Sequence, residues 1–383
     1  MAKIMKLCAV LATVLPMIAQ SATTGNDSFF FYKGHDLSSL PMLETDGYTF
    51  KDTARKNATR PVEAILGDAG MNTVKIREFV NPKDGTYGHA YNLKLAKRMF
   101  DQGYKISLTF HFSNEFADPG RQTLPEHWSS NVDTLAETLR KYVKDRVISY
   151  HRNGIDLDIL CLGNEIRYGM TWPAGFCNIE TEPAADRYAT FANLAKLWLS
   201  ARAGVDDAVA AGANKPQVMI HIDNGWDLWI QSRWFEAFTA NNVSWDRWDV
   251  FGFSFYPYYQ TGATFEALRN SLTAMVQKYN KPVQIVETDY PAICDGKFSP
   301  IPPSSEPSIP YSVEGQLTWV RKIFEVLKGL PNGMGRGIHY WEPAWLNNTS
   351  LGGSGCNDVI LFEGHWNGNT AVGYSRKSVN MFK

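Results

Sequence analysis

Strand-like and helix-like segments alternate along almost the whole chain. The apolar, strand-like runs lie at residues 29–37, 72–80, 104–112, 157–165, 216–224, 248–259, 281–291 and 336–345. The amphipathic stretches between them lie at 61–70, 89–103, 130–153, 185–212, 228–241, 263–279 and 311–329. Short apolar strands in such an alternation are typical of parallel sheets covered by helices. Eight strand-like runs therefore predict an α/β fold that closes into a (β/α)8 TIM barrel.

The alternative is an open, doubly wound sheet. That fold often carries a glycine-rich phosphate-binding loop after its first strand, and no such loop follows residues 29–37. The Pro- and Ser-rich stretch 298–312 falls inside the seventh repeat, so we interpret it as a loop over the barrel mouth rather than a linker. We therefore expect residues 23–383 to form one domain, with the Gly- and Asn-rich tail 346–383 wrapping its surface.

Residues 1–22 have the pattern of a secretory signal peptide. Lys3 and Lys6 form a basic start, residues 7–19 are apolar, and small residues follow at 20–22. A membrane anchor is the alternative interpretation, but the apolar stretch is too short to span a bilayer. We therefore expect a secreted, extracellular protein without a membrane partner, whose mature chain begins near Thr23.

Net charge and cysteine content indicate which partners the protein can have and whether it can form disulfides. The formal net charge is −1, which gives no indication of a nucleic-acid partner. A secreted protein can form disulfides, and the four cysteines that remain without Cys8 allow three connectivities, among which the sequence does not choose. They are Cys161, Cys177, Cys294 and Cys356. Glycosylation sequons, as in a secreted glycoprotein, begin at Asn26, Asn57, Asn242, Asn347 and Asn348.

Polar side chains lie where the eight predicted strands end. In a TIM barrel these ends form the active-site face. A barrel core needs none of these groups, and burying each without a partner costs roughly 2–7 kcal/mol. Their convergence on one face therefore predicts a functional site. They are Asp36, Arg77, Glu78, His111, Ser113, Asn114, Asn164, Glu165, His221, Asp223, Tyr256, Tyr258, Glu287, Asp289, His339, Trp341 and Glu342.

Glu165 and Glu287 end the fourth and seventh strands. Across a barrel mouth such strands can bring two carboxyl groups to about 5–5.5 Å, the separation that double displacement at a sugar carbon requires. The repulsion of like charges keeps one of them protonated as an acid, and Arg77 could hold the other ionised. The alternative interpretations are an ion pair of Glu165 with Arg167 or a helix N-cap contact, and pairing of Glu287 with a basic loop residue.

The other strand-end residues leave more than one interpretation open. His111 contacts either the substrate or Asp36, and the sequence favours neither. His221 and Asp223 are interpreted as supporting contacts, and Glu78 and Glu342 compete with the two glutamates for the catalytic roles. Aromatic rings suit the C–H faces of sugars, although Trp229 fits ordinary packing better. The aromatic residues near the strand ends are Trp226, Trp229, Tyr256, Tyr258, Tyr259, Trp341 and Trp345.

Several long motifs resemble those of a known family, the endo-β-1,4-galactanases of glycoside hydrolase family 53, in its fungal form. The resemblance covers residues 29–360 and implies a barrel with the proton donor after strand four and the nucleophile after strand seven. The motifs are "GHDLSSL" (34–40), "GMNTVKIREFVNP" (70–82), "SLTFHFSNEFADPGRQTLPEHW" (107–128), "LGNEIRYGMTWPAG" (162–175), "GFSFYPYY" (252–259), "VETDYP" (286–291) and "YWEPAW" (340–345).

The resemblance implies a role for each matching residue. Glu165 is the acid/base and Glu287 the nucleophile, positioned by Arg77 and Tyr256, while Asn164 contacts the sugar 2-hydroxyl. Further contacts to the sugar come from Asp36, His111, Ser113, Asn114 and Trp341. The implied partner is a polysaccharide, the β-1,4-galactan of type I arabinogalactan in the pectin of cell walls. The implied enzyme is a retaining hydrolase that attacks inside the chain, and we expect a monomer.

The fungal form also implies a disulfide between Cys294 and Cys356, with no metal and no cofactor. Cys161 and Cys177 are then either free or paired. Two other functions remain open. The same barrel and carboxylate pair serve cellulases, mannanases and xylanases, because loop contacts decide which polysaccharide is bound. A non-catalytic carbohydrate-binding barrel would require the loss of one carboxylate, and both are present.

Overall fold

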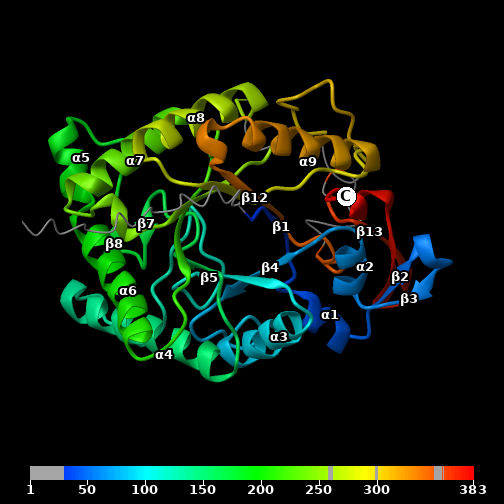
Figure 1. Cartoon of the computed structure of the whole chain (residues 1–383), viewed down its shortest axis with the longest axis horizontal. Helices are drawn as coiled ribbons and strands as arrows, with labels where there is room; N and C mark the ends of the chain where they lie inside the picture. Colours follow the sequence, from blue (N-terminus) through cyan, green and yellow to red (C-terminus); the bar gives the residue numbers. More distant parts are fainter. Residues whose placement is uncertain (1–29, 258–261, 298–300, 349–355, 357) are drawn as a thin grey trace, which may run out of the picture. The chain divides into compact units, whose positions relative to one another are not determined.

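A closed barrel of eight parallel strands forms the centre of the fold (Figure 1). The computed structural model describes residues 30–257, 262–297, 301–348, 356 and 358–383. Each predicted strand run contains one barrel strand, so the (β/α)8 prediction is confirmed and the open sheet is excluded. In barrel order the strands are β1 (Tyr32–Asp36), β12 (Gly335–Tyr340), β11 (Val283–Glu287), β10 (Val250–Ser254), β9 (Gln217–Ile222), β6 (Ile159–Leu162), β5 (Lys105–Phe110) and β4 (Thr73–Glu78).

Helices follow the strands where the sequence pattern predicted them. The predicted stretch 185–212 is divided into two helices, which meet at Phe191. Capping side chains fix where several others begin, because they accept hydrogen bonds from free N–H groups of the first turn: Asn131 for α4, Asp227 for α7, Thr264 for α8 and Ser312 for α9. The helices are α1 (Leu40–Thr45), α2 (Val62–Asp68), α3 (His89–Asp101), α4 (Val132–Arg152), α5 (Ala184–Thr190), α6 (Ala192–Ala210), α7 (Leu228–Ala240), α8 (Phe265–Tyr279) and α9 (Val313–Lys328).

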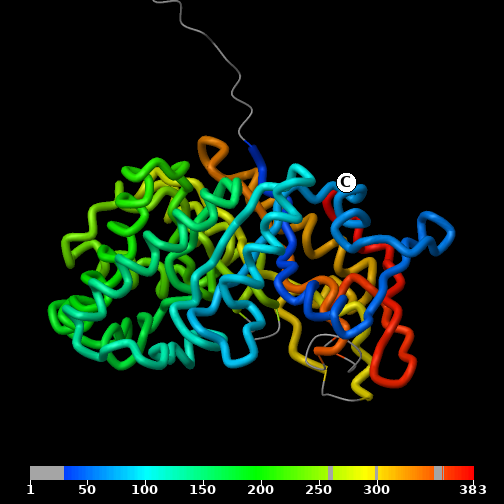
Figure 2. The backbone as a smooth tube through the Cα atoms, turned by 90° about the horizontal axis from the view of Figure 1, so that it is seen from below, coloured from blue at the N-terminus to red at the C-terminus, as the bar shows by residue number. Residues whose placement is uncertain are grey.

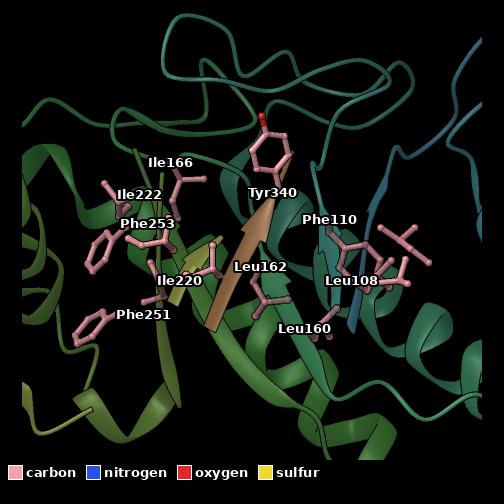
Figure 3. Close-up of a cluster of buried hydrophobic side chains, with 14 of the residues drawn as sticks. Leu108, Phe110, Leu160, Leu162, Ile166, Ile220, Ile222, Phe251, Phe253 and Tyr340 are labelled. Carbon is pink, nitrogen blue, oxygen red and sulfur yellow. The ribbon is translucent and has the colours of Figure 1, made fainter. Parts of the chain in front are cut away.

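The barrel strands separate an apolar outer face from a mixed inner face. Successive side chains of a strand point to opposite faces, and Figure 3 shows outward-facing side chains of β5, β6, β9 and β10 gathered in the core beneath the helices. The inner positions carry a small apolar cluster, which includes Ile159, Cys161 and Met219. Polar groups fill the rest of the interior toward the carboxyl ends of the strands, where the sequence placed its candidate residues.

The C-terminal tail differs from the prediction. Instead of only wrapping the surface, it forms a hairpin of β13 (Phe362–Asn367) and β14 (Thr370–Ser375). This hairpin joins β2 (Thr49–Asp52) and β3 (Ala58–Thr59), so the red end of the chain lies beside a blue segment in Figures 1 and 2. The remaining short elements are β7 (Gly169–Met170), β8 (Gly175–Phe176) and 3-10 turns at Thr53–Arg55, Trp245–Arg247, Pro331–Gly333 and Lys377–Asn380.

Cys294 and Cys356 form a disulfide, as the resemblance implied. It joins the loop between β11 and α9 to the segment after β12, which pins the long seventh loop near the barrel mouth. Cys161 and Cys177 are both buried and free. Burial raises the pKa of the Cys161 thiol to about 12, so this residue stays a neutral packing group. Within the described residues, every helix is too short or too polar to cross a membrane.

Candidate active site

A cavity of about 820 Å³ opens at the carboxyl ends of the barrel strands. Its position agrees with the active-site face of other TIM barrels. Residues from most of the strand ends line it, which brings together side chains that are far apart in sequence. Those used below are Asp36, Arg77, His111, Phe116, Asn164, Glu165, Arg167, Asp223, Ser254, Tyr256, Glu287, Trp341, Trp345 and Cys356.

Glu165 and Glu287 face each other across this cavity. A carboxylate oxygen of each and a ring nitrogen of His221 all lie within 4.8 Å of one another. The backbone at Glu165 has φ +47°, a left-handed conformation that is unusual for a glutamate. Phe112, Asn224 and Glu342, which also follow barrel strands closely, share this conformation. Such backbone strain often accompanies functional positions, because the surrounding structure must hold it in place.

Glu287 is held by two side chains. The Nζ atom of Lys75 donates to Oε1 at 2.5 Å, and the hydroxyl of Tyr256 donates to Oε2 at 3.2 Å. Lys75 is buried, with 2% of its surface exposed. The positive charge beside Glu287 therefore comes from Lys75 and not, as the sequence suggested, from Arg77 or a loop residue.

Arg77 occupies a different part of the mouth. Its guanidinium pairs with Glu342 at 2.5 Å and Asp36 at 3.4 Å. Aromatic rings surround it, with its central carbon 4.3 Å from the ring centre of Tyr87 and 4.9 Å from that of Phe116. Lys75 and Arg77 both point inward from β4, but two residues of a strand span about 6.6 Å. Arg77 therefore lies nearer the rim and does not take the predicted position beside Glu287.

The environment of Glu165 favours its protonated form. Glu165 is open to the cavity but enclosed by protein on its other sides, and this burial raises the pKa of Glu165 well above its usual value. The negative charges of Glu287 and Asp223 raise this pKa further. Arg167, the alternative partner of Glu165, instead pairs with Asp223 at 3.3 Å. Burial also raises the pKa of Asp223, to about 6.

Asn164 and His111 are oriented by the loop after β5. Nδ2 of Asn164 donates to the carbonyl of Ala117 at 2.9 Å, and the N–H of Ala117 donates to Nδ1 of His111 at 3.0 Å. The Nδ1 atom of His111 thus serves the backbone of this loop rather than Asp36. Burial lowers the pKa of His111 well below its usual value, with help from Arg77 and Lys75, so the ring is neutral.

Three other predicted residues, Ser113, Asn114 and Glu78, make contacts outside the cavity. The hydroxyl of Ser113 accepts from the N–H of Glu115, and Oδ1 of Asn114 accepts from the N–H of Asn81. Neither Ser113 nor Asn114 is among the described residues that line the cavity, so they organise the loop. Glu78 points outward and accepts from Tyr150 at 2.6 Å, which removes it as a catalytic candidate.

Glu342, the other competitor, is committed to Arg77 and Ser39. Burial raises the pKa of Glu342 to about 7, and the charge of Arg77 opposes this shift. Trp341 and Trp345 line the cavity, whereas Trp229 is exposed beside Arg233. Tyr258 and Tyr259 lie outside the described residues.

The trio of Glu165, His221 and Glu287 is close enough together to hold a metal ion, but its bonding does not fit that use. Nδ1 and Nε2 of His221 lie 3.0 Å from Asn164 and 2.8 Å from Ser254, so the imidazole could bind a metal only by giving up one of these contacts. Lys75 already supplies a positive charge at Glu287. The three residues are therefore arranged for proton chemistry.

Two residues of the site, Lys75 and Ser254, were not predicted. The strand period of two could have found both, because Lys75 lies two positions before Arg77 and Ser254 two positions before Tyr256 on the same inner faces. Both residues lie in the layer beneath the strand ends, where no candidate residues were predicted on β4 or β10.

The barrel and the paired carboxylates at the ends of its fourth and seventh strands define the protein as a glycoside hydrolase. Residues 32–381 match the model of Glycosyl hydrolase family 53, and the chain belongs to this family. The resemblance inferred from the motifs is thus confirmed.

Individual relatives agree with the family. The chain is 39% identical over 335 residues to a protein of Neosartorya fischeri named probable arabinogalactan endo-beta-1,4-galactanase A, covering 87% of this chain and 89% of that one. It is also 39% identical over 358 residues to arabinogalactan endo-beta-1,4-galactanase A of Aspergillus niger, covering 92% and 94%. A solved structure from a study of two fungal beta-1,4-galactanases matches with 35% identity and a TM-score of 0.80, covering 92% of this chain and 98% of that one.

Proposed function

We propose that the protein is a secreted endo-β-1,4-galactanase that cleaves internal bonds of type I arabinogalactan with retention at the anomeric carbon. The names of the fungal relatives support the substrate. The facing pair of Glu165 and Glu287 is the observation that carries the mechanism. Their nearest oxygens lie within 4.8 Å, whereas inverting enzymes separate the two carboxyl groups by about 6.5–9.5 Å to admit a water.

In the first step Glu287 attacks the anomeric carbon and Glu165 protonates the leaving oxygen. The ion pair with Lys75 and the hydrogen bond from Tyr256 hold the attacking carboxylate in place. The raised pKa of Glu165 keeps the acid protonated at the start of the cycle. The products of this step are a covalent galactosyl–enzyme and a shortened polysaccharide.

In the second step Glu165, now a carboxylate, takes a proton from water, and the water attacks the same anomeric carbon, which breaks the bond to Glu287 and releases its carboxylate. Esterification of Glu287 has removed the neighbouring negative charge, so the pKa of Glu165 falls when it must act as a base. We propose that Asn164 contacts the sugar 2-hydroxyl and that Asp36, His111 and Trp341 line the subsite of the cleaved sugar. Their positions on the cavity wall support these roles.

Replacement of the two glutamates tests this mechanism. Glu287→Ala and Glu165→Ala are each expected to lose galactan hydrolysis, because one lacks the nucleophile and the other the acid. With an activated galactoside and azide, Glu165→Ala is expected to yield a β-galactosyl azide, because azide replaces water in the second step. Reducing-end assays on galactan, cellulose, mannan and xylan measure the substrate preference of the wild type.

Glu363→Ala, at an exposed position on β13, is the matched control and should keep full activity. An α-galactosyl azide from Glu165→Ala would contradict retention. Faster hydrolysis of another polysaccharide would contradict the galactan substrate, and binding without any hydrolysis would favour a non-catalytic barrel.

We also propose that residues 1–22 are removed on secretion and that the enzyme acts as a monomer. The basic and apolar pattern of this segment supports the first proposal, although residues 1–29 lie outside the described structure. Amino-terminal sequencing of protein from the culture medium should begin near Thr23, and light scattering should give the mass of one chain.

A further inference from the structure

Three side chains form a continuous chain of hydrogen bonds that ends on the proposed acid, Glu165. Asn164 follows β6, His221 is on the neighbouring strand β9, and Ser254 ends the next strand, β10. Oδ1 of Asn164 lies 3.0 Å from Nδ1 of His221, Nε2 of His221 lies 2.8 Å from the hydroxyl of Ser254, and this hydroxyl lies 2.5 Å from Oε1 of Glu165. His221 itself is fully buried.

The number of available hydrogens fixes the direction of these bonds. The amide of Asn164 donates through Nδ2 to Ala117, so its Oδ1 atom faces His221 and can only accept. Nδ1 of His221 must therefore carry a hydrogen. Burial, together with the charge of Lys75, lowers the pKa of His221 well below its usual value, so the ring is neutral and Nε2 is an acceptor.

Ser254 then has one hydrogen for two contacts. If this hydrogen is donated to Nε2 of His221, the short contact between Ser254 and Glu165 needs a hydrogen from Glu165. All the bonds are satisfied together only when Glu165 is a carboxylic acid that donates to the hydroxyl. With Glu165 ionised, one contact of Ser254 lacks a hydrogen.

We propose that His221 is a positioning residue that, through Ser254, holds the proton on Glu165 before cleavage and at the same time fixes the side chain of Asn164. This inference rests on the proposed acid/base role of Glu165. It extends that role, because two buried residues beside Glu165, His221 and Ser254, then determine at which stage of the reaction Glu165 carries a proton.

Ser254 changes the acceptor of its hydrogen bond once in each of the two steps of the reaction. When Glu165 gives its proton to the leaving oxygen, Ser254 can turn its hydrogen from His221 to the new carboxylate, and Nε2 loses its donor. When Glu165 takes a proton from water in the second step, the original bonds return. One proton leaves the chain of bonds when Glu165 protonates the leaving oxygen, and one returns from water in the second step, so the number of protons is unchanged over the whole reaction.

Other charged groups face the same residues and must be separated from this effect. Glu287 on β11, Asp223 after β9 and Lys75 on β4 act on Glu165, and Lys75 also acts on His221. Arg167, after β6, pairs with Asp223, and the neutral ring of His111 lines the same cavity. All of these remain in the variants proposed below, so their contributions stay in place.

The test compares two variants that should move the pH profile in opposite directions. Ser254→Ala removes the hydroxyl that, among the described residues, can donate to the Glu165 carboxylate, so the alkaline limb of kcat/KM on galactan should move to higher pH by roughly one pH unit. His221→Leu removes the competing acceptor and frees Ser254 to stabilise the carboxylate, so the limb should fall by a similar amount. Ser254→Thr keeps the hydroxyl and should restore the wild-type limb.

Met219→Leu is the matched control, since Met219 lies two positions before His221 on the same inner face and should leave the limb unchanged. If His221 and Ser254 had only a structural role, both variants would lower kcat, and their alkaline limbs would not shift in opposite directions. Equal shifts, or none, in variants whose circular dichroism is that of the wild type would overturn the inference. If His221→Leu does not fold, an unshifted Ser254→Ala limb overturns it alone. Absence of galactan cleavage by the wild type would instead refute the proposed function.

Discussion

At the scale of single residues, the proposed nucleophile, Glu287, depends on one buried lysine. Lys75→Met would leave the buried Glu287 carboxylate without its positive partner, so the attacking group would lose the ion pair that stabilises and orients it. We expect kcat on galactan to fall by roughly 100-fold or more, as when other active sites lose one electrostatic contact. Lys75→Arg keeps the charge and should retain more activity.

The control for this prediction is Lys97→Met, because Lys97 pairs with Asp101 on the surface of α3. Near-normal kcat in a folded Lys75→Met variant would show that Tyr256 alone suffices to hold Glu287. Melting temperatures of all three variants separate loss of activity from loss of folding.

The two glutamates could be predicted from the sequence, but the contacts that tune them could not. The places of Glu165 and Glu287 follow from the strand pattern, because each ends a parallel strand of a barrel. Which basic group reaches Glu287 depends on the depth of Lys75 and Arg77 inside the barrel, and this depth is a property of the closed sheet. The chain of bonds through His221 likewise crosses three strands and has no local signal.

At the scale of elements, a buried ion pair fastens the C-terminal hairpin. Arg376, directly after β14, makes two bonds of 2.7 Å to Asp358 and one of 2.8 Å to the carbonyl of Ile360. Arg376→Ala leaves Asp358 buried without its partner, and we expect the free energy of unfolding to fall by roughly 3–5 kcal/mol. Urea denaturation followed by tryptophan fluorescence measures this change.

The neighbouring residue provides the control. Lys377 also pairs with a carboxylate, that of Glu314, but both side chains are exposed. Lys377→Ala should therefore cost at most about 1 kcal/mol. Equal losses in the two variants would mean that burial of the pair does not matter.

The barrel strands could be predicted because they are apolar, regularly spaced and each followed by a long connection. The hairpin of β13 and β14 could not, because β13 is largely exposed and lacks an apolar run. Its place is set by the pairing of Val372 with Thr49, which joins segments from opposite ends of the chain. Neither segment alone indicates that the other is its partner.

At the scale of the whole molecule, the disulfide joins the loop after β11 to the segment after β12 at the edge of the cavity. Cys294 and Cys356 are 62 residues apart, and the entropy of the loop they close corresponds to roughly 4 kcal/mol of stability. Replacing both cysteines by serine should lower the melting temperature, measured by calorimetry. Because Cys356 also lines the cavity, activity should be lost at a lower temperature as well.

Reductant provides the control, because it should lower the melting temperature of the wild type and leave that of the double serine variant unchanged. A double variant as stable as the wild type would show that the loops keep their places through other contacts.

The closed barrel also affects where copies of the protein can associate in concentrated solution. A barrel has no free edge to which another chain can add a strand. The four-stranded sheet does, because among the described residues its order is β13–β14–β2–β3, which leaves β3 at one end and β13 at the other. This six-residue strand carries the exposed Trp366 and few charges. Aggregation of the folded enzyme, where it occurs, is therefore expected to begin at β13, far in sequence from Glu165 and Glu287.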